Sequence, residues 1–236
     1  MAEDPIANST NVVLDVENLR HYYEKNRPVL NRSSLSIREG DSVAICGRSG
    51  VGKTTLLEIL GAMRTPREGT VRLMGNSVYQ ASPTKRSQLR GKLLGFVFQE
   101  GHLLPDLSVW ENCRLAVILS GRDWKLPKSR ERFEVLLKSL GLDPGRGDER
   151  PAHFSSGERQ RLAVVRGLMH DPRLLMADEP TGNLDLETSN QLLDLLFPLI
   201  EDHGMGILVA THDRHLAQSL DRVYTLQEGN LTQMDS

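Results

Sequence analysis

No stretch of the 236-residue sequence is long and apolar enough to cross a membrane, since a spanning helix needs about 20 apolar residues. The longest apolar stretch, Leu192 to Ile200, is interrupted by Asp194 and by Pro198. The first residues are polar and acidic, without the basic start and the apolar centre of a signal peptide. We therefore expect a cytosolic protein in which residues 1 to 11 form a flexible tail and any membrane role comes through a partner.

Paired cysteines and an excess of positive charge are also lacking. The two cysteines, Cys46 and Cys113, show no pairing pattern, which is typical of a protein from a reducing compartment. Lys and Arg total 29 against 31 for Asp and Glu, and this balance argues against broad binding to the phosphate backbone of nucleic acid. The sequence has no internal repeat. Its length suits one large α/β domain, or a core with a smaller inserted lobe.

Four short apolar runs are each followed directly by polar side chains. The runs are Ser42–Cys46, Leu94–Phe98, Leu174–Ala177 and Gly206–Ala210. Runs of this kind are typical of buried strands in a parallel sheet. Helical apolar spacing lies between them, over residues 54–60, 129–140 and 158–169. Because ligands bind beyond the carboxyl ends of parallel strands, we expect the polar residues to gather at one edge of a mainly parallel sheet in an α/β fold.

The first run leads into a segment that fits the phosphate-loop pattern G-x-x-x-x-G-K-[ST]. Its residues are Gly47, Arg48, Ser49, Gly50, Val51, Gly52, Lys53 and Thr54, and Thr55 follows on the expected helix. Glycines let backbone N–H groups turn inward toward phosphate oxygens, Lys53 supplies positive charge, and the Thr54 hydroxyl suits Mg²⁺. The alternative is a glycine-rich turn with an unrelated lysine. The strand before the segment and the helix after it favour nucleotide binding.

The third run delivers two neighbouring carboxylates, Asp178 and Glu179, to the same edge. An aspartate in this position holds Mg²⁺ in phosphate-loop NTPases, and Glu179 is then placed to act as the general base on an attacking water. A helix-capping turn is the alternative for an Asp-Glu-Pro sequence alone. Together with the phosphate loop, the pair predicts an ATPase whose cofactors are ATP and Mg²⁺.

A further segment, Phe154 to Glu158, lies just ahead of an amphipathic stretch. Ser155 and Glu158 have the spacing of a capping box, and the alternative is an anion site at a helix N-terminus. The segment resembles the signature motif of ABC ATPases, usually Leu-Ser-Gly-Gly-Gln, from which it departs at Phe154, Ser156 and Glu158. Ser155 and Gly157, which that family directs at the γ-phosphate, are retained.

Other ABC ATPase motifs follow in order. Gln99 resembles the Q-loop glutamine, which senses Mg²⁺ and the attacking water, and His212 resembles the H-loop histidine, which contacts the γ-phosphate. Asp185 belongs to a segment that resembles the D-loop, which links two active sites, although it would also suit a helix cap. Tyr23 lies where the family stacks an aromatic ring on adenine, although Tyr23 and its neighbour Tyr22 would also suit a core.

The resemblance covers residues 12–232 and implies a division of roles among these residues. Catalysis falls to Glu179, His212 and Gln99, metal binding to Thr54, Gln99 and Asp178, and nucleotide contact to the phosphate loop with Tyr23, Thr55, Ser155, Gly157, Glu158 and Asp185. It also implies a homodimer in which each ATP lies between the phosphate loop of one copy and the signature motif of the other. The implied fold is a phosphate-loop NTPase core (12–98 and 166–236) with an N-terminal β region and an inserted helical subdomain (about 99–165).

Two segments indicate a particular group within the ABC ATPases. Residues 88–112 and 157–185 are similar to the lipoprotein-releasing group typified by LolD, whose relatives include the ATPase domain of the macrolide exporter MacB. This similarity implies a peripheral subunit on the cytoplasmic face of the inner membrane that drives a permease. The segment after Gln99 contains a set of apolar residues that we expect to be exposed. They are Leu103, Leu104, Pro105, Leu107, Val109 and Trp110. An exposed set would seat a permease helix, and the alternative is that these residues form the core of a helical lobe.

Other functions explain fewer of these features. A soluble ABC ATPase acting on nucleic acid or ribosomes usually carries two cassettes, a long coiled-coil insert or zinc-binding cysteines, and the sequence has none of these. A phosphate-loop kinase would leave the signature, D-loop and H-loop segments unexplained. A non-hydrolysing cassette would not need Glu179 and His212. We therefore expect no nucleic-acid partner, and a MacB-like efflux ATPase is the alternative to lipoprotein release.

Overall fold

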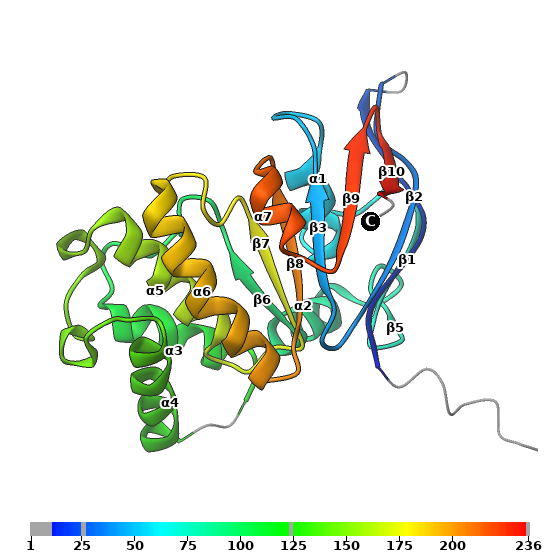
Figure 1. Ribbon diagram of the computed structural model, residues 1–236. Helices are drawn as coiled ribbons and strands as arrows, with labels where there is room; N and C mark the ends of the chain where they lie inside the picture. Colours follow the sequence, from blue (N-terminus) through cyan, green and yellow to red (C-terminus); the bar gives the residue numbers. More distant parts are fainter. Residues whose placement is uncertain (1–10, 25–26, 123–124, 235–236) are drawn as a thin grey trace, which may run out of the picture.

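The computed structural model describes residues 11–24, 27–122 and 125–234, so the predicted tail lies outside it except for Asn11. A six-stranded sheet lies between a four-stranded sheet on one side and a group of helices on the other (Figure 1). Among the described residues, none of the helices combines the length and the hydropathy that a membrane span requires.

The six-stranded sheet contains all four strands that the apolar runs predict. Its order is β10 (Asn230–Gln233), β9 (Arg222–Gln227), β3 (Ser42–Cys46), β8 (Gly206–Thr211), β7 (Leu174–Asp178) and β6 (Leu94–Val97). Strands β9, β3, β8, β7 and β6 are parallel, and β10 pairs antiparallel with β9. The four predicted strands are neighbours, so their carboxyl ends meet at one edge. The prediction of a mainly parallel sheet is confirmed.

The four-stranded sheet is antiparallel and corresponds to the predicted N-terminal β region. Its order is β2 (Arg27–Arg38), β1 (Val12–Glu24), β4 (Glu68–Leu73) and β5 (Asn76–Ser77). A hydrogen bond of 2.7 Å from the backbone N–H of Asn31 to the carbonyl of Gly229 links β2 to the turn between β9 and β10. The chain therefore brings its first strands beside its last ones, as Figure 1 shows.

Seven α-helices are described. They are α1 (Lys53–Leu60), α2 (Pro83–Leu93), α3 (Val109–Leu119), α4 (Leu126–Ser139), α5 (Ser156–Leu168), α6 (Leu186–Asp202) and α7 (Arg214–Gln218), with short 3₁₀ turns at Pro144–Arg146 and Pro151–His153. The helices predicted over residues 54–60, 129–140 and 158–169 correspond to α1, α4 and α5, each of which begins one to three residues earlier. Helices α3 and α4 and the turns lie within the predicted helical subdomain, whose exact boundaries stay a prediction.

Strand β7 shows why the central strands are almost uniformly apolar. Leu174 and Met176 pack into the core that the six-stranded sheet shares with α1 and the four-stranded sheet. Leu175 and Ala177 point the other way, into the core shared with α5, α6 and the helical subdomain. Because alternate residues of a strand face opposite sides and both sides are covered, polar side chains are confined to the strand ends. This arrangement is what leaves the carboxyl edge available for a site.

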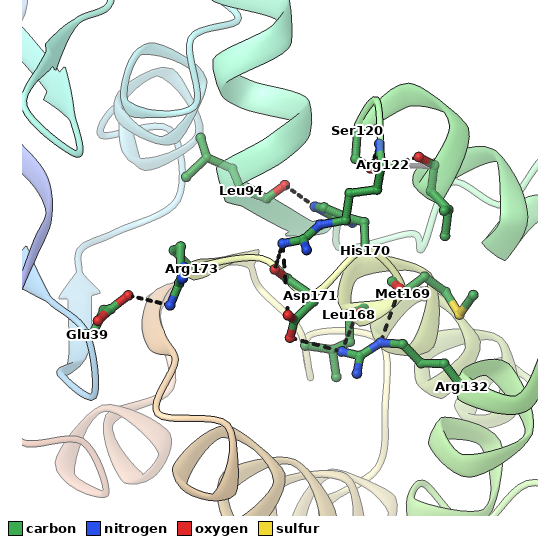
Figure 2. Close-up of polar contacts among 11 residues, drawn as sticks. Glu39, Leu94, Ser120, Arg122, Arg132, Leu168, Met169, His170, Asp171 and Arg173 are labelled. Atoms are coloured by element: carbon green, nitrogen blue, oxygen red, sulfur yellow. Dashed lines mark hydrogen bonds and ion pairs between the residues drawn. The ribbon is translucent and has the colours of Figure 1, made fainter. Parts of the chain in front are cut away.

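Arginines join the helical subdomain to the amino end of β7 (Figure 2). Arg132 of α4 donates hydrogen bonds of 3.0 and 3.2 Å to the carbonyls of Leu168 and Met169, at the end of α5. Arg122 donates a hydrogen bond of 2.8 Å to the carbonyl of Asp171, in the turn that leads into β7. Basic side chains satisfy the free carbonyls at a helix C-terminus in this way.

Candidate nucleotide-binding site

The phosphate loop connects β3 to the N-terminus of α1, as its pattern predicts. Gly52 has a φ of 115°, a left-handed conformation that favours glycine. A Cβ atom on Gly52 would lie 2.4 Å from Cγ1 of Val29 in the four-stranded sheet, so a larger residue would not fit without a shift. Gly50 also has a positive φ, of 77°. The loop thus turns back onto the helix N-terminus, where unpaired N–H groups favour anions.

Lys53 is buried at the base of this loop, with only 7% of its surface exposed. Its Nζ donates a hydrogen bond of 2.8 Å to the carbonyl of Gly47 and lies 3.1 Å from Oε1 of Glu179. A buried ammonium group requires such partners because burial of an unpaired charge is costly. The lysine therefore connects the phosphate loop to the acidic residues that follow β7.

Thr54 and Asp178 meet at the same edge, although 124 positions separate them in the sequence. The Thr54 hydroxyl donates a hydrogen bond of 2.8 Å to Oδ2 of Asp178. Burial raises the pKa of Asp178 above its usual value, and the Thr54 hydrogen bond partly opposes this shift. A hydroxyl and a carboxylate are hard oxygen donors of the kind that hold Mg²⁺ beside phosphate groups. The pair therefore fits the predicted metal ion.

Glu179 lies one residue beyond β7 and has a φ of 47°, which is uncommon for a residue with a side chain. Its Oε2 accepts a hydrogen bond of 3.1 Å from the Thr211 hydroxyl and lies 2.9 Å from Nδ1 of His212. Burial pushes the pKa of Glu179 upward, but the hydrogen bonds from His212 and Lys53, together with the Lys53 charge, outweigh burial and hold that pKa below its usual value. The carboxylate is thus ionised and held by groups from two other segments, Lys53 of the phosphate loop and Thr211 with His212 at the end of β8.

These residues surround an open cavity of about 490 Å³. Its lining consists of Arg48, Ser49, Gly50, Gly52, Lys53, Thr54, Thr55, Gln99, Asp178, Glu179 and His212. Gln99 and His212 come from the ends of two different strands, so the structure brings together the phosphate-loop, Q-loop, acidic and H-loop residues that the sequence singled out. Gly47 and Val51 belong to the same loop without lining the cavity.

The signature segment lies outside this cavity. Ser155 caps α5 and forms a complete capping box with Glu158: the Ser155 hydroxyl accepts from the Glu158 N–H at 3.2 Å, and Glu158 Oε2 accepts from the Ser155 N–H at 2.8 Å. Arg146, which the sequence analysis did not single out, donates a hydrogen bond of 2.9 Å to the other carboxylate oxygen of Glu158. A Cβ on Gly157 would lie 2.7 Å from Cγ2 of Thr188, so the segment packs closely on α6.

The D-loop and adenine candidates are also absent from the lining of the cavity. Asp185 caps α6, where its carboxylate accepts hydrogen bonds of 2.9 and 2.8 Å from the N–H and the hydroxyl of Thr188. Tyr23, at the end of β1, is 57% exposed, and its hydroxyl lies 3.0 Å from Oγ1 of Thr55, which does line the cavity. Tyr23 is therefore not a core residue. A nucleotide contact by either residue stays a prediction.

The apolar segment after Gln99 is less exposed than the sequence suggested. Val109 is fully buried, because it begins α3 with its side chain in the core, so the expectation of an exposed side chain is wrong there. Leu103 and Trp110 are partly buried, and the Trp110 ring packs on Phe133 with centroids 5.2 Å apart. Leu104 stays 45% exposed.

Comparison with known proteins places this site in a family. The model of the ABC transporter family matches residues 30–182. The lipoprotein-releasing system ATP-binding protein LolD of Pseudomonas fluorescens is 41% identical over 94% of this chain and 98% of that protein. The chain belongs to the ABC transporter family. LolD of Xanthomonas axonopodis pv. citri is 40% identical over 94% of this chain and 91% of that protein.

Solved ABC cassettes share the fold as well as the sequence pattern. A dimeric ATP-binding cassette in a post-hydrolysis state, bound to ADP and Pi, is 31% identical and has a TM-score of 0.84, covering 92% of this chain and 96% of that one. The chain is accordingly a nucleotide-binding ATPase subunit of an ABC transporter, and the predictions of its fold and its ATPase activity are confirmed.

Proposed function

We propose that this ABC ATPase hydrolyses ATP as half of a head-to-tail homodimer and thereby drives a permease that releases lipoproteins from the membrane. The observation that carries the proposal is the convergence of Lys53, Thr54, Asp178 and Glu179 on one cavity, while Ser155 lies outside it. A single copy therefore supplies the phosphate loop and the base, and a second copy supplies the signature segment. Leu186, next to Asp185, is 72% exposed, which suits an interface there.

The chain's own groups account for the chemistry. Loop N–H groups and Lys53 bind the β- and γ-phosphates, and Thr54 with Asp178 and Gln99 would hold Mg²⁺, which supplies neutralisation of the phosphate charge. Glu179 accepts the proton of the attacking water, and His212 contacts the γ-phosphate. In the structure, Lys53 and His212 are both bound to Glu179. We infer that the γ-phosphate competes for these two groups and so releases the carboxylate for its role as base.

The sequence similarity to LolD proteins favours lipoprotein release as the activity. Both LolD proteins match nearly their full lengths at about 40% identity. We accordingly place the subunit on the cytoplasmic face of the inner membrane, held there by its permease. A MacB-like efflux system is the alternative at the level of cargo.

Reconstitution tests directly whether a lipoprotein is the cargo. The full chain and its permease would be placed in liposomes with a triacylated lipoprotein, and transfer of that lipoprotein to the soluble phase would be measured. We expect transfer with ATP and none with Glu179→Gln. ATPase stimulation by a macrolide, without lipoprotein transfer, would instead support the efflux alternative.

We further propose that the permease docks near Leu103–Trp110, beside Gln99. Leu104 tests this position better than Trp110, because the Trp110 ring packs on Phe133 whereas Leu104 is exposed. Leu104→Asp should leave the basal ATPase activity and the melting temperature unchanged and abolish co-purification with the permease. Leu119→Asp, at an exposed position on α3, is the matched control. Equal co-purification of Leu104→Asp and wild type would contradict docking at this segment.

A further inference from the structure

Three contacts hold the Tyr23 ring in place. The guanidinium carbon of Arg64 lies over the ring, 5.3 Å from its centroid. The ring of His21 meets Tyr23 edge-on, with centroids 5.2 Å apart and an interplanar angle of 89°. The Tyr23 hydroxyl lies 3.0 Å from Oγ1 of Thr55. Because one face, one edge and the tip are engaged while more than half of the residue is exposed, the free surface is the ring face opposite Arg64.

Arg64 is itself fixed in position. Its Nε lies 2.6 Å from Oε2 of Glu58, and its backbone N–H donates a hydrogen bond of 3.0 Å to the Glu58 carbonyl. Its own carbonyl accepts a hydrogen bond of 2.6 Å from the Tyr79 hydroxyl. Glu58 and Thr55 lie one turn apart on α1, the helix that begins at the phosphate loop. The same helix therefore fixes the hydroxyl of Tyr23 through Thr55 and the ring face of Tyr23 through Glu58 and Arg64.

We propose that Arg64 is a positioning residue of the base-binding site: held by Glu58, it fixes the Tyr23 ring so that the opposite face receives the base of the nucleotide. The proposal rests on the proposed role of Tyr23 and assigns a role to two residues that lie outside the ABC sequence motifs. An arginine suits this position because a planar guanidinium can lie flat on an aromatic ring while it keeps a hydrogen-bonded ion pair with a carboxylate.

The contact between Arg64 and Tyr23 should affect ATP binding and not the rate of hydrolysis. Arg64 reaches the nucleotide only through Tyr23, and neither residue lines the cavity that holds Glu179. A loss of this contact frees the ring to move, and the base must then order it on binding. We therefore expect the KM for ATP to rise and kcat to stay the same, the pattern of an interaction that ground state and transition state share equally.

The test compares Arg64→Ala with Arg67→Ala in the full chain. Arg67 lies over the neighbouring Tyr22 ring, 5.5 Å from its centroid, and provides a matched loss of charge and of the same kind of contact. Calorimetry would measure the affinity for Mg-ATP and for Mg-tripolyphosphate, which has the phosphate chain without a base. We expect Arg64→Ala to bind ATP about 5-fold more weakly, a part of the stacking contribution of one base, and to bind tripolyphosphate as wild type does. Arg67→Ala should bind both as wild type does.

A double-mutant cycle shows whether Arg64 acts through Tyr23. In a Tyr23→Ala background, Arg64→Ala should produce no further loss of ATP affinity. Equal ATP affinity of Arg64→Ala and wild type would overturn the positioning role, as would tighter ATP binding, which would mean that Arg64 occupies the face meant for the base. Weaker binding of tripolyphosphate would overturn it too, because a general loss of charge or structure would then be the cause.

Two further variants separate the possible failures. Glu58→Gln leaves Arg64 in the chain but removes its ionic partner, so it should weaken ATP binding in the same direction and leave tripolyphosphate binding unchanged; it also serves if Arg64→Ala does not fold. If Tyr23→Ala binds ATP as tightly as wild type, the proposed role of Tyr23 is wrong. If Tyr23→Ala weakens binding but Arg64→Ala and Glu58→Gln do not, only the positioning by Arg64 is wrong.

Discussion

The two ends of strand β7 both carry dense charge, but they use it in opposite ways. At the carboxyl end, Asp178 and Glu179 face an open cavity together with Lys53. At the amino end, Arg122 and Arg132 donate hydrogen bonds to carbonyls of the α5–β7 turn (Figure 2). His170 is buried there, and its Nε2 lies 3.0 Å from the carbonyl oxygen of Leu94. The cavity at the first end leaves room for a ligand, whereas the second end consists of contacts within the protein.

The difference shows that a cluster of charged residues indicates function only when it borders space that a ligand can enter. The arginines at the amino end join the helical subdomain to the sheet, and Arg173 adds an ion pair of 2.9 Å with Glu39 on the other side of the same turn. We therefore assign chemistry to the carboxyl end and stability to the amino end. Substitutions at the two ends should separate turnover from folding.

The largest expected effect is that of Glu179→Gln on turnover. Removal of a general base commonly lowers a rate by about 10² to 10⁴, whereas the phosphate contacts and therefore ATP affinity should be retained. The variant should also accumulate as an ATP-bound dimer in gel filtration. Glu201→Gln, an exposed acid on α6, is the control and should be fully active. ATP hydrolysis by Glu179→Gln at the wild-type rate would remove Glu179 from the role of base.

At the amino end, Arg132→Met should lower stability rather than turnover. The variant loses the hydrogen bonds from the charged guanidinium to the carbonyls of Leu168 and Met169. We expect this loss to lower the free energy of unfolding by about 2 kcal/mol. Urea unfolding should show this loss, while kcat per folded molecule stays close to that of wild type. Lys138→Met, exposed on the same helix, should change neither quantity. An Arg132→Met protein of unchanged stability with low kcat would reverse the assignment of the two ends.

A further effect on stability, of similar size, should appear as acid sensitivity at His170. Burial, with the charges of Arg122 and Arg132, lowers the pKa of His170 from 6.5 to about 4. Because the unfolded chain then binds the proton more readily, stability is present above pH 6.5 and is lost as the pH falls toward 4. Between pH 7.5 and pH 5 the loss amounts to about 2 kcal/mol. Urea titrations at both pH values should show it in wild type and not in His170→Gln; the same slope in both proteins would exclude His170 as the cause.

The carboxyl end was far more predictable from sequence than the amino end. The phosphate loop is a contiguous pattern, and the strand before Asp178 and Glu179 is a contiguous apolar run, so local sequence determines both. The convergence of these segments follows from the parallel order of the strands alone. The left-handed backbone of Glu179 has no local signal, and the carboxylate is held by Thr211 and His212, which lie far away in the sequence.

Contacts made by single long side chains could not be predicted in this way. Arg132 and Arg64 lie in ordinary polar sequence, and their partners are determined by the tertiary packing of α4 on α5 and of β1 beside α1. Burial of Val109 was missed for a similar reason, since its apolar neighbours Leu103 and Leu104 are partly or largely exposed. The capping boxes at Ser108 and Ser155 do have a local signal, the Ser-x-x-Glu spacing, which was recognised only at Ser155.

The central proposal is that the cavity at the carboxyl end is half of a site that a second copy completes, and mixing two inactive variants tests it most directly. Ser155→Arg blocks the signature side and Lys53→Ala disables the phosphate side, so each variant alone should be inactive. In a mixed dimer, Lys53 of the first chain and Ser155 of the second form one intact site. We predict that ATP hydrolysis reappears on mixing and rises with total protein concentration. If both variants are folded and no activity returns at concentrations where wild type hydrolyses ATP, each ATP is not held between two copies.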